Sequence, residues 1–157
     1  MTSVIEQFYS AFQARDAAGM AACYHPNVVF NDPVFRDLRG PRAAGMWAML
    51  LGRSKDLKIT FRDARDDGQT GSAHWEAWYT FSQSKRPVHN IIDARFRLQD
   101  GKIIEHTDQF DFWRWSRMAL GTPGLLLGWS PVIRSKVQRT AMEGLEKYMS
   151  SRERSGA

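Results

Sequence analysis

Three successive stretches decide the fold: residues 57–65 (LKITFRDAR), 72–82 (SAHWEAWYTFS) and 88–98 (VHNIIDARFRL). In each of them apolar and polar side chains alternate, which is the period of a half-buried β-strand. Short turn sequences bound these stretches: DG at 67–68, KRP at 85–87 and DG at 100–101. A fourth strand, over residues 103–112, is expected to complete an antiparallel meander.

The sequence before the meander predicts three helices. Ser3 and Glu6 have the spacing of a capping box and precede apolar residues at helical intervals. Asp16 is placed to cap a second, short helix that runs to Tyr24. A third helix is predicted for residues 41–51, which begin with a proline suited to the first helical position.

A short strand is predicted between the second and third helices, over residues 28–30, and ends at Asp32 and Pro33. The helices thus come first and the long strands second. Because no helix crosses over between the four long strands, this order predicts an α+β fold.

The composition of the chain limits the classes of protein to which it can belong. A chain of 157 residues, 43% hydrophobic and 25% charged, has the size and balance of one globular domain. It has no apolar run near the roughly 20 residues that span a bilayer, and its start lacks the pattern of a signal peptide, so we expect a cytoplasmic protein. The single cysteine, Cys23, excludes an internal disulfide and any multi-cysteine metal site. No motif indicates nucleic-acid binding.

The last part of the chain departs from the strand pattern. A helix is predicted for residues 114–120, ended by Gly121, and after it comes a break at residues 122–124 (TPG). A last helix should begin near Ser130, with a loose tail from Ser150. The apolar stripe of this last helix comprises Ile133, Val137, Ala141, Leu145 and Tyr148.

The apolar run LLLGW at residues 125–129 needs a cover, because an exposed run of this kind promotes association. We expect it to fold back over a pocket as a lid, together with the last helix. Docking on a membrane surface is the alternative, since the chain from Arg114 onward has 8 basic and 3 acidic side chains and so holds the whole excess of the +5 formal charge. We prefer the lid, because the stripe on the last helix is regular and narrow.

Several short motifs occur in an order and spacing that resembles a known group of proteins. They are Phe8-Tyr9 followed by Asp16, Tyr24-His25-Pro26, Phe30-Asn31-Asp32-Pro33, Gly40 before a helix, Asp100-Gly101-Lys102-Ile103, and His106-Thr107-Asp108 with Phe110-Asp111. On these residues the chain is similar to the nuclear-transport-factor-2-like superfamily, specifically to its ketosteroid-isomerase-like and SnoaL-like, polyketide-cyclase-like members.

The resemblance implies a curved antiparallel sheet that N-terminal helices wrap into a cone with an internal pocket. We therefore predict a cone domain at residues 1–120 and a C-terminal helical extension, residues 121–157, packed on the same domain. The resemblance also implies a small hydrophobic ligand and a homodimer through the outer sheet face, where Asp93, Arg95 and Arg97 alternate with apolar residues. Members of this group perform many unrelated functions, so the fold does not settle the function.

Asp32 matches the general base of the isomerase-like members, an aspartate just before proline at the end of the first strand. Alternation places Val28, Phe30 and Asp32 on one face, as a pocket wall requires. A carboxylate in an apolar pocket is poorly solvated, which raises its pKa and makes it a stronger base. The competing interpretation is a turn residue that bonds its own backbone.

The hydrogen-bond donors that serve the isomerase's oxyanion are not matched. Its first-helix tyrosine falls at Phe8, and Tyr9 lies one residue further on, about 100° around the helix. Its protonated aspartate falls at Asp93, which the apolar alternation puts on the outer face. Steroid-type isomerisation is therefore not favoured, because the base would have no partner to stabilise a dienolate.

His106 and Asp108 are two residues apart on a strand, so both can face the pocket. Asp108 also matches an aspartate of limonene-epoxide-hydrolase-like relatives, in which it orients or protonates. The pair could activate water, or it could form a structural hydrogen bond between strands. A metal held by both residues and Asp32 would need three ligands that meet, so we predict no metal site.

Candidate substrate-binding residues are mostly aromatic, because a pocket lined by large rings suits a flat apolar ligand, although most aromatic side chains will simply form the core. The candidates are Tyr9, Phe30, Trp47, Trp75, Tyr79, Asn90 and Phe110.

Two functions stay open. The first is a cofactor-free isomerase, cyclase or hydrolase for a small hydrophobic substrate, with Asp32 as the base and Asp108 with His106 as the acid or water-positioning pair. The second is a non-catalytic module for ligand binding or protein interaction, with a membrane-peripheral form that docks through residues 125–129. Convergence of Asp32, His106 and Asp108 on one cavity would favour the enzyme.

Overall fold

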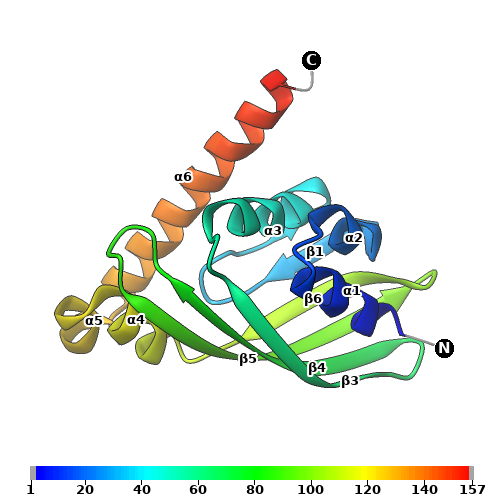
Figure 1. Ribbon diagram of the computed structural model, residues 1–157, viewed down its shortest axis with the longest axis horizontal. Helices are drawn as coiled ribbons and strands as arrows, with labels where there is room; N and C mark the ends of the chain where they lie inside the picture. The colour runs from blue at the N-terminus through cyan, green and yellow to red at the C-terminus, as the bar shows by residue number, and fades with distance from the viewer. Residues whose placement is uncertain (1–2, 156–157) are drawn as a thin grey trace.

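Six strands form one curved, open sheet in the computed structural model, which describes residues 3–155 (Figure 1). In spatial order they are β2 (Leu38–Arg39), β1 (Tyr24–Asn31), β6 (Lys102–Gln109), β5 (Pro87–Gln99), β4 (Thr70–Thr80) and β3 (Lys58–Asp66). Strands β3 to β6 form the predicted antiparallel meander, although β6 ends before Phe112. Strand β1 pairs with β6 in parallel, so the sheet is mixed, which the strand pattern alone did not reveal.

The two faces of the sheet are distinguished by the alternation along β5. Even-numbered residues from Val88 to Leu98 are buried, and odd-numbered residues from Ile91 to Gln99 are exposed. Asp93 therefore lies on the outer face, as predicted. On the concave face, Asn90 lies opposite Ala77 of β4, and Ala94 lies opposite Asp108 of β6. Because of this register, the side chains of Asn90 and Asp108 both point to the concave side of the sheet.

Three N-terminal helices cover the concave face (Figure 1): α1 (Val4–Gln13), α2 (Ala17–Ala22) and α3 (Pro41–Arg53). The predicted caps of the first two are confirmed, because Ser3 Oγ accepts the backbone N–H of Glu6 at 3.1 Å and Asp16 Oδ1 accepts that of Gly19 at 2.9 Å. Helix α2 ends earlier than predicted, since Tyr24 is already the first residue of β1 and pairs with β6.

The chain after the sheet is almost entirely helical, with α4 (Phe112–Leu120), α5 (Thr122–Leu127) and α6 (Pro131–Ser155). The predicted helix end at Gly121 is confirmed, and its φ of 70° makes the turn. The break expected at residues 122–124 is wrong, because α5 starts there with a proline in its first turn. The loose tail expected from Ser150 is also wrong, since α6 continues to Ser155.

Helix α6 packs its apolar stripe onto the body of the protein. Leu145 is fully buried, and the helix runs beside α3 (Figure 1). Arg42 of α3 forms a bidentate ion pair with Glu146 of α6. The other members of the predicted stripe are partly buried against the core: Ile133, Val137, Ala141 and Tyr148.

The apolar run at residues 125–129 is not covered, so that part of the lid prediction is wrong. Gly124 and Gly128 pack directly against Ser116 of α4, where a Cβ would clash, and this turns the leucine face of α5 outward. Among residues 3–155 no helix is both long and apolar enough to cross a membrane. The exposed fractions are 51% for Leu125, 62% for Leu126, 50% for Leu127 and 71% for Trp129.

Candidate functional site

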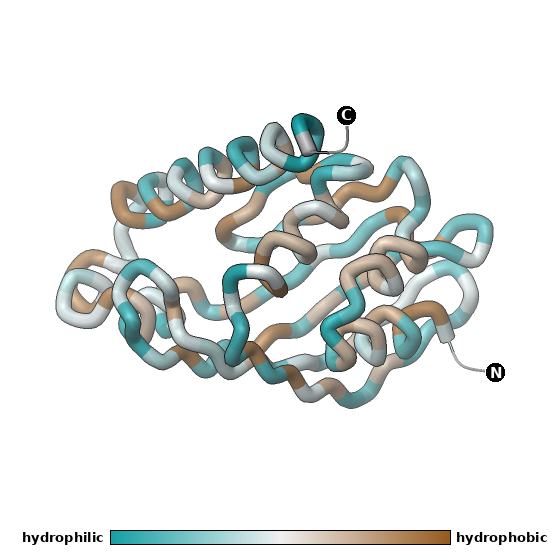
Figure 2. Tube along the Cα trace, turned by 45° about the horizontal axis from the view of Figure 1, so that its top comes forward, coloured by the Kyte–Doolittle hydropathy of each residue, from teal (hydrophilic) through white to brown (hydrophobic). Residues whose placement is uncertain are grey.

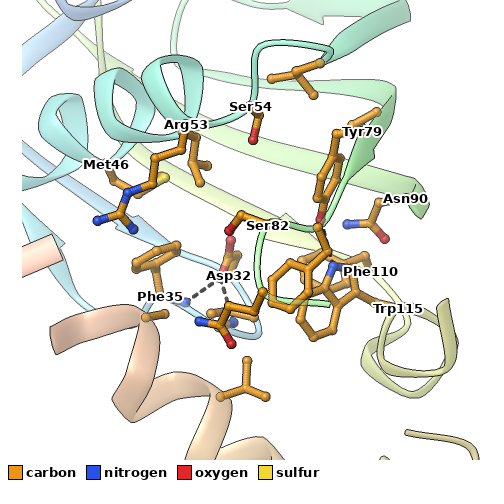
Figure 3. Close-up of a pocket in the computed structure, with 18 of the residues that line it drawn as sticks. Asp32, Phe35, Met46, Arg53, Ser54, Tyr79, Ser82, Asn90, Phe110 and Trp115 are labelled. Carbon is orange, nitrogen blue, oxygen red and sulfur yellow. Dashed lines mark hydrogen bonds between the residues drawn. The ribbon is translucent and has the colours of Figure 1, made fainter. Parts of the chain in front are cut away.

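A cavity of about 500 Å³ lies between α3, the concave face of the sheet and α6, as the close-up in Figure 3 shows. Its volume is in the range of small-molecule sites. Its polar lining includes the carboxyls of Asp32 and Asp108, the side chains of Tyr79 and Asn90, and further polar or charged residues such as Arg53, Ser54, Ser82 and Lys136. The rest of the wall is mostly apolar and includes Met46 and Trp47, Trp75 and Ile92, Phe110 and Trp115, and Ile133 and Val137.

Asp32 comes directly after β1, in a tight turn that holds its carboxyl at the cavity (Figure 3). Its Oδ1 accepts the backbone N–H groups of Val34 and Phe35, each at 2.6 Å. Burial raises the pKa of Asp32 from 3.8 to about 7; the Phe35 N–H opposes this rise and the nearby Asp108 adds to it. Asp32 is thus both a turn residue and a cavity carboxyl, and it exchanges protons near neutral pH.

Asp108 lies on β6 at the inner wall of the cavity and is held by a chain of buried groups. Its Oδ1 accepts N–H donors from His106 Nε2 at 2.9 Å and from Trp75 Nε1 at 3.4 Å. The other ring nitrogen of His106, Nδ1, is 2.8 Å from the hydroxyl of Tyr24. That hydroxyl in turn accepts the indole N–H of Trp47 at 2.7 Å.

This chain fixes the tautomer of His106. An indole N–H can only donate, so the Tyr24 hydroxyl accepts from Trp47 and turns its own proton toward His106 Nδ1. Burial holds the pKa of Tyr24 well above its ordinary value of 10, so the hydroxyl keeps that proton. The ring proton of His106 is then on Nε2, from which it is donated to Asp108.

His106 does not lie on the cavity, contrary to the prediction that it, Asp32 and Asp108 would all face it. The ring is fully buried behind Asp108, and both of its nitrogens are engaged in hydrogen bonds. Asp32 and Asp108 do line one cavity. His106 can therefore act only through Asp108, as a positioning residue.

Tyr79 and Asn90 bring two further hydrogen-bonding groups to the cavity (Figure 3). Trp115 Nε1 donates to Tyr79 Oη at 2.8 Å, which leaves the phenolic proton free for a ligand. Burial raises the pKa of Tyr79 to about 12, so this proton is retained at neutral pH. Asn90 is 7% exposed, and its side-chain amide has no hydrogen-bond partner within residues 3–155.

The other predicted substrate-binding residues divide into two groups. Tyr9 and Phe30 do not line the cavity, because both are fully buried in an aromatic cluster of the core. Tyr9 stacks on Phe61 at 5.4 Å, and Phe30 packs edge-on against His106 at 4.9 Å. Those that do line the cavity are Trp47, Trp75, Tyr79, Asn90 and Phe110.

Tyr24 and Trp115 were not among the predicted site residues, although both hold side chains of the site. Nothing in the local pattern marks Tyr24, because its role depends on the parallel pairing of β1 with β6. Asp111 marks the start of α4, the helix that carries Trp115, because its carboxyl accepts the backbone N–H of Arg114 at 3.0 Å, but this cap does not indicate that Trp115 faces the cavity. Within residues 3–155, no group of three or more His, Cys, Asp or Glu side chains could hold a metal ion.

Solved structures with this fold include proteins of different activities. One is a limonene-epoxide-hydrolase (LEH)-like epoxide hydrolase from M. tuberculosis, with 21% identity, a TM-score of 0.60 and coverage of 78% of this chain and 90% of that one. Another is IdmH, a proposed polyketide cyclase from Streptomyces antibioticus, with 20% identity, a TM-score of 0.60 and coverage of 71% and 92%.

A third structure is a hypothetical protein with a ketosteroid-isomerase-like fold from Catenulispora acidiphila, in complex with trimethylamine. It has 13% identity, a TM-score of 0.66 and coverage of 83% of this chain and 100% of that one. Identities this low establish a shared fold and no shared reaction.

No curated protein matches the chain. Residues 5–106, well over half of its length, match the model of the SnoaL-like domain. The matched region runs from the first turn of α1 to His106 and so includes Asp32, Tyr79 and Asn90. The chain therefore belongs to the SnoaL-like domain family.

Proposed function

We propose that the protein is a cofactor-free acid–base enzyme that acts on a small, mostly apolar molecule bound in the cavity. The observation that carries this proposal is that two carboxyls, Asp32 and Asp108, line one largely apolar cavity of about 500 Å³. One of them, Asp32, has a pKa of about 7, and a general base or acid is most effective when its pKa lies near the working pH.

Proton transfer at a carbon next to a carbonyl fits this set of groups best. The ionised carboxyl of Asp32 takes the proton, and the electron pair moves onto the carbonyl oxygen as an enolate. The Tyr79 hydroxyl and the Asn90 amide, both facing the cavity, are available to donate to that oxygen. In this proposal Tyr79 and Asn90 are the oxyanion donors, in place of the positions matched by Phe8 and Asp93.

The enolate then has two outcomes in this proposal. It takes the proton back at another carbon, which is isomerisation, or it attacks a second carbonyl of the same molecule, which is cyclisation. Asp108 has its Oδ1 held by His106 and Trp75, so its other oxygen serves to orient a substrate hydroxyl or a water molecule. A water held there is the basis of the hydrolase alternative.

Ligand binding without catalysis is the second candidate function. It would require no titratable group inside the cavity, since an apolar wall alone holds an apolar ligand. Two carboxyls and an unpaired amide in this apolar wall would only weaken such binding, because each must lose water when the ligand enters. Their presence supports the enzyme over the binding module.

Deuterium uptake from D₂O into bicyclic ketones such as 2-tetralone tests the proposal. We expect the protein to accelerate uptake over buffer, and Asp32→Asn to lower the rate by at least about 100-fold while 2-tetralone still binds, as measured by tryptophan fluorescence. Asp37→Asn is the matched control, because Asp37 lies in the same turn region but is exposed. Equal rates for the protein and Asp32→Asn, or uptake no faster than in buffer for a ketone that binds, would contradict the proposal.

For quaternary structure we propose a homodimer through the outer faces of β4 and β5. Trp78 and Ile91 are exposed there by 39% and 38%, beside the exposed Asp93 and Arg95. Arg97 is held within the chain by Glu105 at 3.0 Å, so Arg95 is the more available charge. Sedimentation should show a dimer that Arg95→Glu weakens; a monomer at micromolar concentration would contradict this arrangement.

We also propose a cytoplasmic location, which is in keeping with a chain whose lone cysteine, Cys23, is a free thiol.

A further inference from the structure

An exposed apolar surface lies at the α5 end of the molecule. In Figure 2, α5 and the start of α6 form one end of the protein, beyond the sheet. Proteins that stay monomeric in water rarely expose large contiguous apolar patches, and such patches mark binding sites. We define the α5 patch by its members, which are 50–75% exposed: Leu125, Leu126, Leu127, Trp129 and Val132.

The patch is held in shape by the contacts beneath it. Gly124 and Gly128 lie so close to Ser116 that no side chain would fit between them, and Ser116 Oγ, whose proton is donated to the Trp113 carbonyl at 2.8 Å, lies 3.4 Å from the Gly124 carbonyl oxygen. On the other side, the indole N–H of Trp113 donates to the carbonyl of Leu125 at 3.2 Å. Helix α5 is thus anchored to α4 by its glycine face, and its leucines have no route into the core.

Positive charge flanks the patch without any acidic neighbour in sequence. Residues 112–142 contain five basic and no acidic side chains. Lys136 and Arg139 are exposed and lie four and seven residues after Val132, so they share its face of α6. The first acidic residue on that face is Glu143, about 16 Å along the helix from Val132.

A second basic group adjoins the patch from α4. The guanidinium of Arg117 lies 4.3 Å from the centre of the Trp113 ring, which is itself 39% exposed. The Nε of Arg117 is buried and has no hydrogen-bond partner within the described residues 3–155, so only the end of its guanidinium is available to a ligand. An indole capped by a cation is well suited to the boundary between acyl chains and headgroups.

We propose that the α5 patch and the basic face of α6 are a docking surface for an anionic lipid bilayer. The leucines and Trp129 would enter the acyl boundary, while Lys136 and Arg139 would meet the headgroup charge. A bilayer is favoured over a protein partner because the surface combines the leucines of α5 and the following Trp129 with cationic side chains on the adjacent α6. This inference does not depend on the proposed enzymatic activity.

Docking in this way would bring the cavity close to the membrane. Pro123 of α5 and Ile133 and Lys136 of α6 line the cavity and lie within or next to the stretch that carries the patch. An apolar substrate dissolved in the bilayer would then reach the cavity without crossing water. Helix α6 covers the cavity while α5 docks, so a lid and a docking surface are compatible in this chain.

Co-sedimentation of the full chain with vesicles tests this proposal. The probes are vesicles of phosphatidylcholine alone and of phosphatidylcholine with about 30% phosphatidylglycerol. We expect binding to the anionic vesicles only, with a partition coefficient that falls as salt is added. The double variant Leu126→Asp/Trp129→Asp should lower it about ten-fold or more, and Arg139→Glu about five-fold.

Two matched controls place the same chemical changes elsewhere. Ala18→Asp adds the same acidic group at an exposed apolar position of α2, and Arg62→Glu reverses an exposed charge on β3; both should bind vesicles as the unaltered protein does. Circular dichroism checks that the variants fold, which their exposed positions predict. Equal binding to neutral and anionic vesicles, or an equal loss in the controls, would overturn the proposal.

Absence of vesicle binding would overturn it as well. If, in addition, Leu126→Asp/Trp129→Asp converted an oligomer to a monomer in sedimentation, the α5 patch would be a contact between copies of the chain.

Discussion

Replacing Asp32 with asparagine should stabilise the fold above neutral pH, although it removes the proposed base. The pKa of Asp32 is raised from 3.8 to about 7, so between these values the folded chain keeps a proton that the unfolded chain has released. The free energy of unfolding therefore falls as pH rises through this window and levels off above about pH 7. The full shift corresponds to about 4 kcal/mol.

The expected gain from Asp32→Asn is smaller than this figure. The side-chain oxygen of asparagine can still accept the N–H groups of Val34 and Phe35, but a charged carboxylate accepts them more strongly. Asp32 is also partly exposed, and solvent weakens the effect of burial. We expect a net gain of about 1–2 kcal/mol for Asp32→Asn near pH 8 and no gain near pH 4.

Urea denaturation followed by tryptophan fluorescence across this pH range measures the difference. Asp37→Asn is the control and should show no pH-dependent gain, because Asp37 is exposed. If Asp32→Asn is less stable by the same amount at every pH, the carboxyl serves the turn alone and the reasoning about its burial is refuted.

Three further changes test the rest of the architecture. Tyr24→Phe leaves two buried ring nitrogens without their partner and should cost about 2 kcal/mol in urea denaturation; an unchanged stability would show that the buried chain of hydrogen bonds does not stabilise the fold. Gly124→Ala places a methyl group against the backbone of α4 and should lower the melting temperature by about 5 °C or more, whereas Gly52→Ala, with open space around it, should not. Deleting residues 131–157 removes one wall of the cavity, so calorimetry should show a lower melting temperature and fluorescence titration weaker binding of 2-tetralone; a truncated protein that keeps both would show that α6 is not part of the site.

The meander and the helix caps could be predicted because both are local in sequence. Alternation over residues 57–98 defined three long strands and correctly put Asp93 outside. Ser3 and Asp16 marked helix starts through bonds to residues three positions away. The parallel pairing of β1 with β6 joins segments about 75 residues apart, and no short-range pattern encodes it.

From the sequence, the site could be predicted only to the extent of which face of its strand each residue occupies. Alternation put Asp32 and Asp108 on the correct faces, but it also put Phe30 and His106 on the cavity, because it describes a face and does not describe depth. Whether a position on that face meets empty space or packed rings depends on the helices above it. The aromatic cluster around Tyr9 belongs to the core, so the cavity begins only beyond it.

The exposed run at residues 125–129 was mispredicted for a different reason. The premise that an apolar run must be covered is correct for a chain that contacts only water. The short distance from Gly124 and Gly128 to Ser116 decides which face of α5 is buried, and no sequence pattern encodes that distance. The glycine face of α5 therefore packs against α4, and its leucine face is exposed to solvent.

Titration of the aspartate carboxyl carbons by carbon-13 nuclear magnetic resonance tests most directly whether Asp32 and Asp108 share one apolar cavity. We predict one carboxyl signal with a midpoint near pH 7, absent in Asp32→Asn, because burial holds the pKa of Asp32 at about 7. In Asp108→Asn the midpoint should move to lower pH, since the charge on Asp108 contributes to the raised value. A protein in which every aspartate titrates below about pH 5, or in which Asp108→Asn leaves the Asp32 midpoint unchanged, would contradict the account.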